Sequence, residues 1–312
     1  MRNQKYLLVI VGPTAVGKTE LCLKLAKKFN SEIISCDSRQ FYREMNLGTA
    51  KPSHEELDQV PHHLIDSHSI FEEYDVKQYE SDVLAILDKL YQKSNMVLLT
   101  GGSGMYADII TQGMDSIPDI SPEIREEVIR LYQQNGLEWL QNQVSIHDPI
   151  YFDQVDRQNP QRLMRALEVC LGTQQPYSNF RQKKKVERPF VSIKIGLDRD
   201  REELYQRIDD RMDQMIEKGL FEEAESLFPY RNLNALQTVG YTEIFDFMEG
   251  VYDRVEAIRL LKRNSRRYAK RQMTWFRKDP EIQWFHPDQF NQIIDFISAQ
   301  IALNPPNAAT QL

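Results

Sequence analysis

A run of eight residues near the start of the chain has the spacing of a phosphate-binding loop. The stretch 12–19 reads GPTAVGKT and fits the pattern G-x-x-x-x-G-K-[ST]. It follows the apolar run 6–11 and opens a helix-like stretch, so its backbone N–H groups should form a concave anion site at a helix N-terminus. A glycine turn without a ligand is the alternative, which the strand–loop–helix context disfavours. Lys18 would add a point charge, and Thr19 could be a ligand of Mg²⁺. The residues expected to bind phosphate are Gly12, Pro13, Thr14, Ala15, Val16, Gly17, Lys18 and Thr19.

One carboxylate, Asp37, follows the second apolar run, 32–35. Because the carboxyl ends of parallel strands open onto one crevice, Asp37 and the phosphate loop should share a cleft. An Asp beside a bound phosphate ester suits a general base that takes a proton from a nucleophile. The alternative is an Asp that only caps the turn before Ser38.

The apolar run 96–99 ends in TGGSG, without the Asp that a nucleotide hydrolase usually places after a second strand. Glycines at such a point indicate a tight turn, or a ligand or backbone segment that passes close by. Ser103, within this stretch, could donate a hydrogen bond to a ligand.

Seven cations recur at helical spacing between residues 259 and 271, which places them on one face of a helix. No acidic residue interrupts 257–278, and a face of one sign over several turns favours a polyphosphate partner. Leu261, Tyr268 and Trp275 are expected to face a core from the opposite side. The alternatives are neutralisation by the acidic rest of the chain and arginines that turn inward to pair with Asp or Glu. The seven are Arg259, Lys262, Arg263, Arg266, Arg267, Lys270 and Arg271.

These residues require a scaffold of alternating strands and helices. Continuous apolar strands between helices predict a parallel sheet covered on both faces, an α/β core similar to that of P-loop NTPases. The expected strands are 6–11, 32–35, 63–66, 96–99 and 191–197, and the expected helices include 18–29, 76–92 and most of the chain from 204 onward.

The pattern changes between the two halves of this core. Residues 121–188 are polar and helical with proline punctuation, which predicts a helical insertion into a catalytic core of 1–120 plus 189–312. Lys183, Lys184 and Lys185 form a second basic patch in this insertion. Taken alone it indicates a solvated loop, and together with the cationic helix face it could clamp a nucleic-acid backbone.

Composition limits the class of protein. The 312 residues are 41% hydrophobic and 27% charged, with no apolar run long enough to cross a bilayer, so we expect a cytoplasmic protein without a membrane partner. Three widely spaced cysteines indicate neither a zinc site nor a disulfide framework. The six histidines are interpreted as structural or pocket-lining. The net charge of −7 argues against nucleic acid, but the one-signed helix face argues for it.

Eight stretches, in order and over nearly the whole length, resemble the bacterial tRNA dimethylallyltransferases. They are GPTAVGKT, DSRQFY, GTAKP, PHHLID, TGGSGMY, NPQRLMRALEV, VGYTE and AKRQMTWFR. The resemblance implies transfer of a dimethylallyl group from dimethylallyl diphosphate to the exocyclic N6 amine of the adenosine 3′-adjacent to the anticodon, in tRNAs reading codons that begin with U. It implies that the loop holds a diphosphate with Mg²⁺, and that the monomeric enzyme binds the anticodon stem-loop.

The resemblance also implies roles for individual residues. Arg211 would bind the diphosphate beside Lys18, and Ser103 would contact both substrates. Asp37 would be the base, because the adenine amine is a poor nucleophile until it loses a proton. Ser103 stands where Thr is commoner, and no zinc finger follows the core. The implied tRNA contacts are Asp37, Ser38, Arg39, Gln40, Ser103, Arg125, Gln161, Arg162, Leu163, Met164, Arg165, Gly240 and Tyr241, with Arg263, Arg266, Arg267, Lys270 and Arg271 on the phosphates.

Three other functions are compatible with part of these features. A small-molecule kinase would share the loop and Asp37 but leave the cationic face unexplained. A prenyltransferase acting on free adenine nucleotides would share the chemistry without needing an RNA clamp. A non-enzymatic RNA-binding protein would leave the intact phosphate loop without a purpose.

Overall fold

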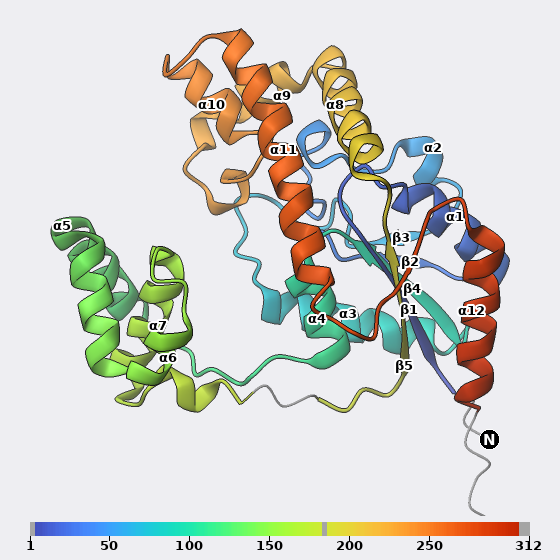
Figure 1. Cartoon of the computed structure of the whole chain (residues 1–312), viewed down its shortest axis with the longest axis horizontal. Coiled ribbons are helices and arrows are strands. Elements are labelled where there is room, and N and C mark those ends of the chain that lie inside the picture. Colours follow the sequence, from blue (N-terminus) through green and yellow to red (C-terminus); the bar gives the residue numbers. More distant parts are fainter. Residues whose placement is uncertain (1–3, 183–185, 306–312) are drawn as a thin grey trace, which may run out of the picture. The chain divides into compact units, whose positions relative to one another are not determined.

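The computed structural model describes residues 4–182 and 186–305 and contains a six-stranded, wholly parallel sheet (Figure 1). The strand order β3-β2-β4-β1-β5-β6 puts the first strand in the interior, which confirms the predicted α/β fold. Chain connections leave β1 and its neighbour β4 in opposite directions, so a crevice opens at their carboxyl ends. The strands are β1 (Tyr6–Val11), β2 (Ile33–Ser35), β3 (His62–His63), β4 (Met96–Gly101), β5 (Val191–Leu197) and β6 (Gln283–Phe285).

Two strands differ from the sequence-based expectation. The strand expected at 63–66 is only His62–His63, because Leu64 and Asp66 take left-handed backbone angles that end the extended run. The short edge strand β6 was not anticipated; its three residues pair with the end of β5 and extend the sheet.

The helix starts follow local capping chemistry. The Asp75 carboxylate accepts N–H bonds from Lys77 and Gln78 to begin α3, and the Asn159 side chain begins α7 in front of Pro160. The helices are α1 (Lys18–Phe29), α2 (His54–Leu57), α3 (Val76–Leu90), α4 (Gly104–Gln112), α5 (Pro122–His147), α6 (Pro149–Gln154), α7 (Pro160–Thr173), α8 (Arg201–Glu217), α9 (Leu220–Leu227), α10 (Thr242–Met248), α11 (Arg254–Phe276) and α12 (Phe290–Leu303), with 3₁₀ turns η1 (Leu47–Thr49), η2 (Tyr177–Phe180), η3 (Phe228–Tyr230) and η4 (Asn234–Leu236).

The core lies against β1, all six residues of which are buried. Leu8 and Ile10 point to one face, where they join a cluster with α1, α8 and α12. Leu7 and Val9 point to the other face and are also buried. A strand that is apolar on both faces sits in the middle of a covered sheet, so the loop that follows β1 is held from two sides.

The chain divides into two compact units, 1–111 with 188–312 and 112–187. The smaller unit begins at Gln112 and not at the expected residue 121, because Gln112 accepts a hydrogen bond from the Val186 N–H and Ile120 packs on Gly172. Its own core joins α5, α6 and α7 around residues such as Leu140. The basic patch Lys183–Lys184–Lys185 lies outside the described residues.

No helix in 4–182 or 186–305 combines the length and the apolar character needed to cross a membrane.

Candidate active site

The phosphate loop occupies the turn between β1 and α1, and cations hold its carbonyl groups. Lys18 Nζ donates to the Gly12 and Pro13 oxygens at 2.9 and 2.7 Å. Arg207 Nε donates to the Ala15 oxygen at 2.9 Å, and Arg199 Nε donates to the Val16 oxygen at 2.8 Å. Because the C=O and the following N–H of a planar trans peptide point in opposite directions, tying down the carbonyls turns amide groups towards the opposite side. The loop is thereby preorganised for an anion.

Two half-buried cations, Lys18 and Arg211, face the loop without a strong carboxylate partner. Burial, reinforced by the nearby Arg211 guanidinium, lowers the pKa of Lys18 to about 8. Burial also lowers the pKa of Arg211, whose nitrogens contact Thr14 Oγ1 at 3.4 Å and the Ala50 oxygen at 3.2 Å. Cations whose charged forms are penalised by burial gain most from an incoming anion, so this pair suits a diphosphate.

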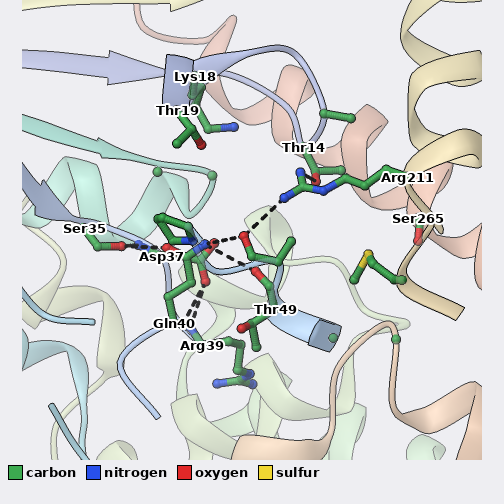
Figure 2. A pocket seen from close by; sticks show the side chains of 18 of the residues that line it. Thr14, Lys18, Thr19, Ser35, Asp37, Arg39, Gln40, Thr49, Arg211 and Ser265 are labelled. Atoms are coloured by element: carbon green, nitrogen blue, oxygen red, sulfur yellow. Dashed lines mark hydrogen bonds between the residues drawn. The ribbon is translucent and has the colours of Figure 1, made fainter. Parts of the chain in front are cut away.

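Asp37 enters the same cavity from the turn after β2 (Figure 2). Its Oδ1 accepts the Arg39 N–H at 2.9 Å and the Gln40 N–H at 3.3 Å. The turn-capping alternative is therefore realised, yet it uses only one of the two oxygens: no described residue is recorded as a hydrogen-bond donor to Oδ2. Burial raises the pKa of Asp37, and the turn amides and Lys18 offset part of that rise. A carboxylate with a raised pKa and a free oxygen is a better proton acceptor.

Ser38 and Ser103 connect this turn to the start of α4. Ser103 Oγ accepts the Ser38 N–H at 3.0 Å and contacts Ser38 Oγ at 3.1 Å. Gln40 donates to the carbonyls of Thr49 and Ala50 and accepts from Ser35 Oγ, so its amide is used within the protein. The cavity, of about 540 Å³, brings Thr14, Lys18, Asp37, Arg39, Gln40, Arg211 and Gly240 together.

The glycines after β4 are explained by close contacts. A Cβ on Gly101 would lie 2.6 Å from the Cys36 carbonyl carbon, one on Gly102 would lie 2.2 Å from Gln272 Nε2, and one on Gly104 would lie 2.1 Å from the Trp275 ring. The expectation that backbone passes close to this stretch is confirmed at Gly101, whereas Gly102 and Gly104 lie against side chains.

Gln272 was missed by the sequence analysis as a site residue. Its Oε1 accepts the Thr14 N–H at 2.9 Å, and its Nε2 donates to the Gly102 oxygen at 2.9 Å. The side chain is buried and ties the phosphate loop to the β4–α4 loop. The available signal was a polar residue at a buried position of α11, in register with Leu261, Ser265 and Phe276.

We predict that Gly102→Ala weakens binding of inorganic pyrophosphate by about tenfold, the cost of one or two lost hydrogen bonds. The new methyl group would displace Gln272 and release Thr14. Titration calorimetry of pyrophosphate measures the effect. Gln272→Ala should produce the same defect, and the double variant should be no worse than either; a double variant with summed defects would contradict this coupling.

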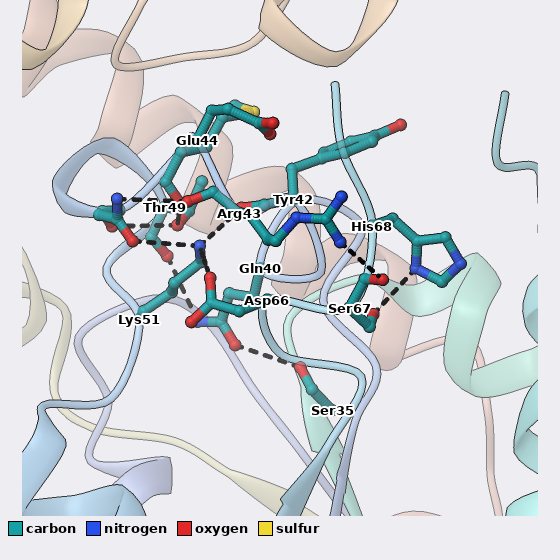
Figure 3. A network of polar contacts seen from close by, with 12 residues as sticks. Ser35, Gln40, Tyr42, Arg43, Glu44, Thr49, Lys51, Asp66, Ser67 and His68 are labelled. Atoms are coloured by element: carbon teal, nitrogen blue, oxygen red, sulfur yellow. Dashed lines mark hydrogen bonds and ion pairs between the residues drawn. The ribbon is translucent and has the colours of Figure 1, made fainter. Parts of the chain in front are cut away.

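The GTAKP and PHHLID motifs contact each other next to the cavity through a network of polar groups (Figure 3). Lys51, from GTAKP, forms an ion pair with Asp66, from PHHLID. Its ammonium group also donates to the backbone carbonyl oxygen of Tyr42 at 2.6 Å. The Lys51 side chain is only 7% exposed, so this pair holds the two cavity-lining segments in register. His62 lines the cavity, and His63 contacts Glu32 at 2.7 Å, in agreement with structural or pocket-lining histidines.

The cations of α11 fall into two groups. Lys262 and Arg266 turn towards the neighbouring α8, where they pair with Asp213 at 2.6 Å and Asp209 at 2.5 Å. Arg259 pairs with Glu256 on its own helix. The inward-pairing alternative is thus correct for part of the face, and Arg266 is not free to bind RNA phosphates. Of the seven cations between 259 and 271, which all lie in the described part of the chain, four have no carboxylate within ion-pair distance: Arg263, Arg267, Lys270 and Arg271.

Two sequence expectations about side-chain direction need correction. Trp275 does not face a core: it is 39% exposed, and its Nε1 donates to Asp108. Tyr241 was expected to contact tRNA, but its ring is fully buried and its hydroxyl donates to Glu223 at 2.6 Å. The neighbouring Gly240 lines the cavity with a backbone φ of 106°.

In the smaller unit, the segment 161–165 begins α7 and shows two kinds of side chain. Leu163 and Met164 pack in that unit's core, so their side chains are not available to RNA, contrary to the expectation. Gln161 and Arg162 are exposed. Arg165 and Arg125 lie 3.2 and 3.8 Å from the buried carboxylate of Glu168.

Comparison with known proteins shows which family this sequence is similar to. A family model described as IPP transferase matches residues 40–279. A tRNA dimethylallyltransferase of Cytophaga hutchinsonii is 51% identical over 297 residues, which cover 95% of this chain and 98% of that protein.

Two solved structures are similar over nearly the whole chain. The full-length tRNA isopentenylpyrophosphate transferase from Bacillus halodurans superposes with a TM-score of 0.71 at 36% identity, covering 96% of this chain and 98% of that one. A eukaryotic dimethylallyltransferase acting on tRNA gives a TM-score of 0.79 at 24% identity, covering 98% of this chain and 81% of that one; at this identity the likeness shows the fold alone.

Proposed function

The chain belongs to the IPP transferase family and is a prenyl-transferring enzyme that acts on tRNA, and from this premise we propose which reaction its cavity performs. The donor is dimethylallyl diphosphate. The acceptor is the N6 amine of the adenosine 3′-adjacent to the anticodon, in tRNAs that read codons beginning with U. The observation that carries this proposal is that one cavity contains a preorganised anion loop, two half-buried cations and Asp37.

On the donor side, the protein stabilises the leaving group. As the bond between the allylic carbon and the diphosphate oxygen breaks, negative charge grows on the diphosphate and positive charge spreads over the allyl group. Lys18, Arg211 and the loop amides would meet the negative charge in a site that excludes much of the bulk water. Their lowered pKa values express the cost of keeping this positive charge buried before the anion arrives.

On the acceptor side, Asp37 removes a proton. The amine nitrogen forms a bond to the allylic carbon, the carbon–oxygen bond to the diphosphate breaks, and the amine proton moves to Asp37. The adenine has to leave its stack in the anticodon loop to reach a carbon inside the protein. Ser38 and Ser103 lie beside Asp37 and would contact the flipped nucleotide.

The residues present fit a Mg²⁺ ion that takes most of its ligands from the diphosphate and water. Within 4–182 and 186–305, no group of three or more His, Cys, Asp or Glu side chains could hold a metal ion by itself. Thr19, at the start of α1, would supply one hydroxyl ligand. When bound, the ion would neutralise part of the diphosphate charge.

For the RNA backbone, we propose the α11 cations without recorded carboxylate partners, together with Arg39 of the larger unit. Gln161, Arg162, Arg165 and Arg125 of the smaller unit would add further contacts. The proposal also places a monomeric enzyme in the cytoplasm, and the three free thiols at Cys22, Cys36 and Cys170 suit a reducing compartment.

The double variant Arg267→Ala with Lys270→Ala is predicted to weaken tRNA binding and to flatten its salt dependence. Loss of two phosphate contacts should reduce the magnitude of the slope of log K against log[salt] by about 1.5. Lys262→Ala with Arg266→Ala is the matched control, since it removes the same charge from cations already paired with α8. Filter binding at several salt concentrations measures both. Equal changes in the two slopes would contradict the division of the α11 cations into ones that bind RNA and ones paired with α8.

The experiment that tests the function supplies the protein, Mg²⁺ and dimethylallyl diphosphate with two separate acceptors. One is an anticodon stem-loop with adenosine after the anticodon, and the other is AMP. Mass spectrometry should find one added C5H8 unit on the stem-loop only. Modification of AMP alone would overturn the RNA assignment, and no product with either acceptor would overturn the proposed transfer.

A further inference from the structure

A glutamate outside every motif discussed so far joins two loops that line the cavity. Glu223, on α9, accepts the Leu47 N–H on Oε2 at 2.8 Å. Its Oε1 accepts the Gly48 N–H at 3.0 Å and the Tyr241 O–H at 2.6 Å. Burial, assisted by the Glu223 carboxylate, raises the pKa of Tyr241, so the hydroxyl stays a donor. Three donors from two separate segments therefore converge on one carboxylate.

The two segments also touch each other closely. A Cβ on Gly48 would lie 2.4 Å from the Tyr241 ring, and one on Gly240 would lie 3.3 Å from the Gly48 oxygen. The fully buried ring thus packs against η1, and Glu223 accepts hydrogen bonds from the Leu47 and Gly48 amides of the same turn. Movement of 47–50 requires breaking the bonds to Glu223.

Segment 47–50 ends at Ala50, whose carbonyl oxygen contacts both the proposed diphosphate site and the turn that carries Asp37. The Ala50 oxygen accepts from Arg211 at 3.2 Å and from Gln40 Nε2 at 3.3 Å. Arg211 belongs to the proposed diphosphate site, and the Gln40 N–H donates to the Asp37 carboxylate that caps its own turn (Figure 2). A shift of Ala50 would displace a donor-side group and an acceptor-side group together.

We propose that Glu223 is a positioning residue that sets segment 47–50 and, through it, the orientation of Arg211 towards the diphosphate. The inference rests on the proposed function for its catalytic meaning. Glu223 does not itself touch substrate, since its two oxygens are committed to protein donors. Its carboxylate is suited to the task because it accepts from three donors without needing a proton of its own.

The test compares Glu223→Gln with Glu222→Gln, its exposed neighbour on α9. A glutamine turns one acceptor into an N–H₂ group that faces an N–H or O–H donor. Calorimetry with inorganic pyrophosphate should show affinity about tenfold weaker in Glu223→Gln, the effect of losing a charge-assisted bond, and unchanged in Glu222→Gln. Equal affinity in Glu223→Gln and the unaltered protein would overturn the proposal.

A cycle with Arg211→Lys separates positioning from a general loss of stability. If Glu223 acts through Arg211, the effect of Glu223→Gln on pyrophosphate affinity should largely vanish in the Arg211→Lys background. Effects that simply add would overturn the proposed route. If Glu223→Gln does not fold, Tyr241→Phe removes one of the three donors and should still weaken pyrophosphate about threefold, and an unchanged affinity would overturn the proposal. Pyrophosphate binding does not depend on prenyl transfer. If the unaltered enzyme were inactive, the proposed function would be refuted, but the pyrophosphate affinities of the variants would still test the role of Glu223.

Discussion

Replacing Asp37 with asparagine is expected to lower kcat for prenyl transfer by about 100- to 10,000-fold, the usual contribution of a general base. Asparagine keeps an oxygen for the Arg39 and Gln40 amides, so the turn should persist while the proton acceptor is lost. RNA affinity should change by no more than about tenfold, since one hydrogen bond contributes only about 0.5–1.5 kcal/mol net. Single-turnover kinetics with an anticodon stem-loop would separate the two quantities.

The pH profile adds a second readout for the same residue. A base must be deprotonated, so the rate should rise with pH through the pKa of Asp37, which burial places above its ordinary value of 3.8. The asparagine variant should lose this rising limb. Asp210→Asn is the matched control, because Asp210 also lines the cavity but is exposed and bonded to Gln206. A defect in affinity with kcat intact would remove Asp37 from the proton-transfer role.

The second large effect is expected for Lys18→Met, which should reduce kcat/KM by about 100- to 1,000-fold, the range found when one donor to a developing anion is removed. Methionine keeps the length of the side chain and loses its charge. Because diphosphate binding favours the charged lysine, and the pKa of Lys18 is about 8, pyrophosphate affinity should fall as the pH rises above 8.

Calorimetry at pH 7 and pH 9 would measure this dependence, and the difference between proteins cancels the titration of pyrophosphate itself. Lys18→Met should show less of the decline than the unaltered protein. Lys24→Met on the same helix, whose lysine is exposed and paired with Glu20, should behave like the unaltered protein. An identical pH dependence in all three proteins would mean that Lys18 does not bind the diphosphate.

Features determined by near neighbours along the chain could be predicted from the sequence. The apolar run of β1, the glycines of the loop and the start of α1 at Lys18 follow from backbone geometry and burial pattern within about 25 residues. Asp37 was predicted as a site residue because it directly follows a buried strand of a parallel sheet, where ligands bind. Each of these positions depends on a local rule.

The direction of the long side chains was decided only by the tertiary structure. The seven cations of α11 look alike in sequence, but α8 supplies Asp213 and Asp209 to two of them from 49 and 57 positions away. Gln272 reaches Thr14 across 258 positions, and Glu223 reaches Leu47 across 176. Buried polar groups must find partners, and helical periodicity states which face a residue occupies without stating which donor or acceptor will lie opposite. The sequence by itself therefore determined the fold class, the phosphate loop and the position of Asp37 after β2, and packing between distant segments determined the partners of Gln272, Glu223 and the α11 cations.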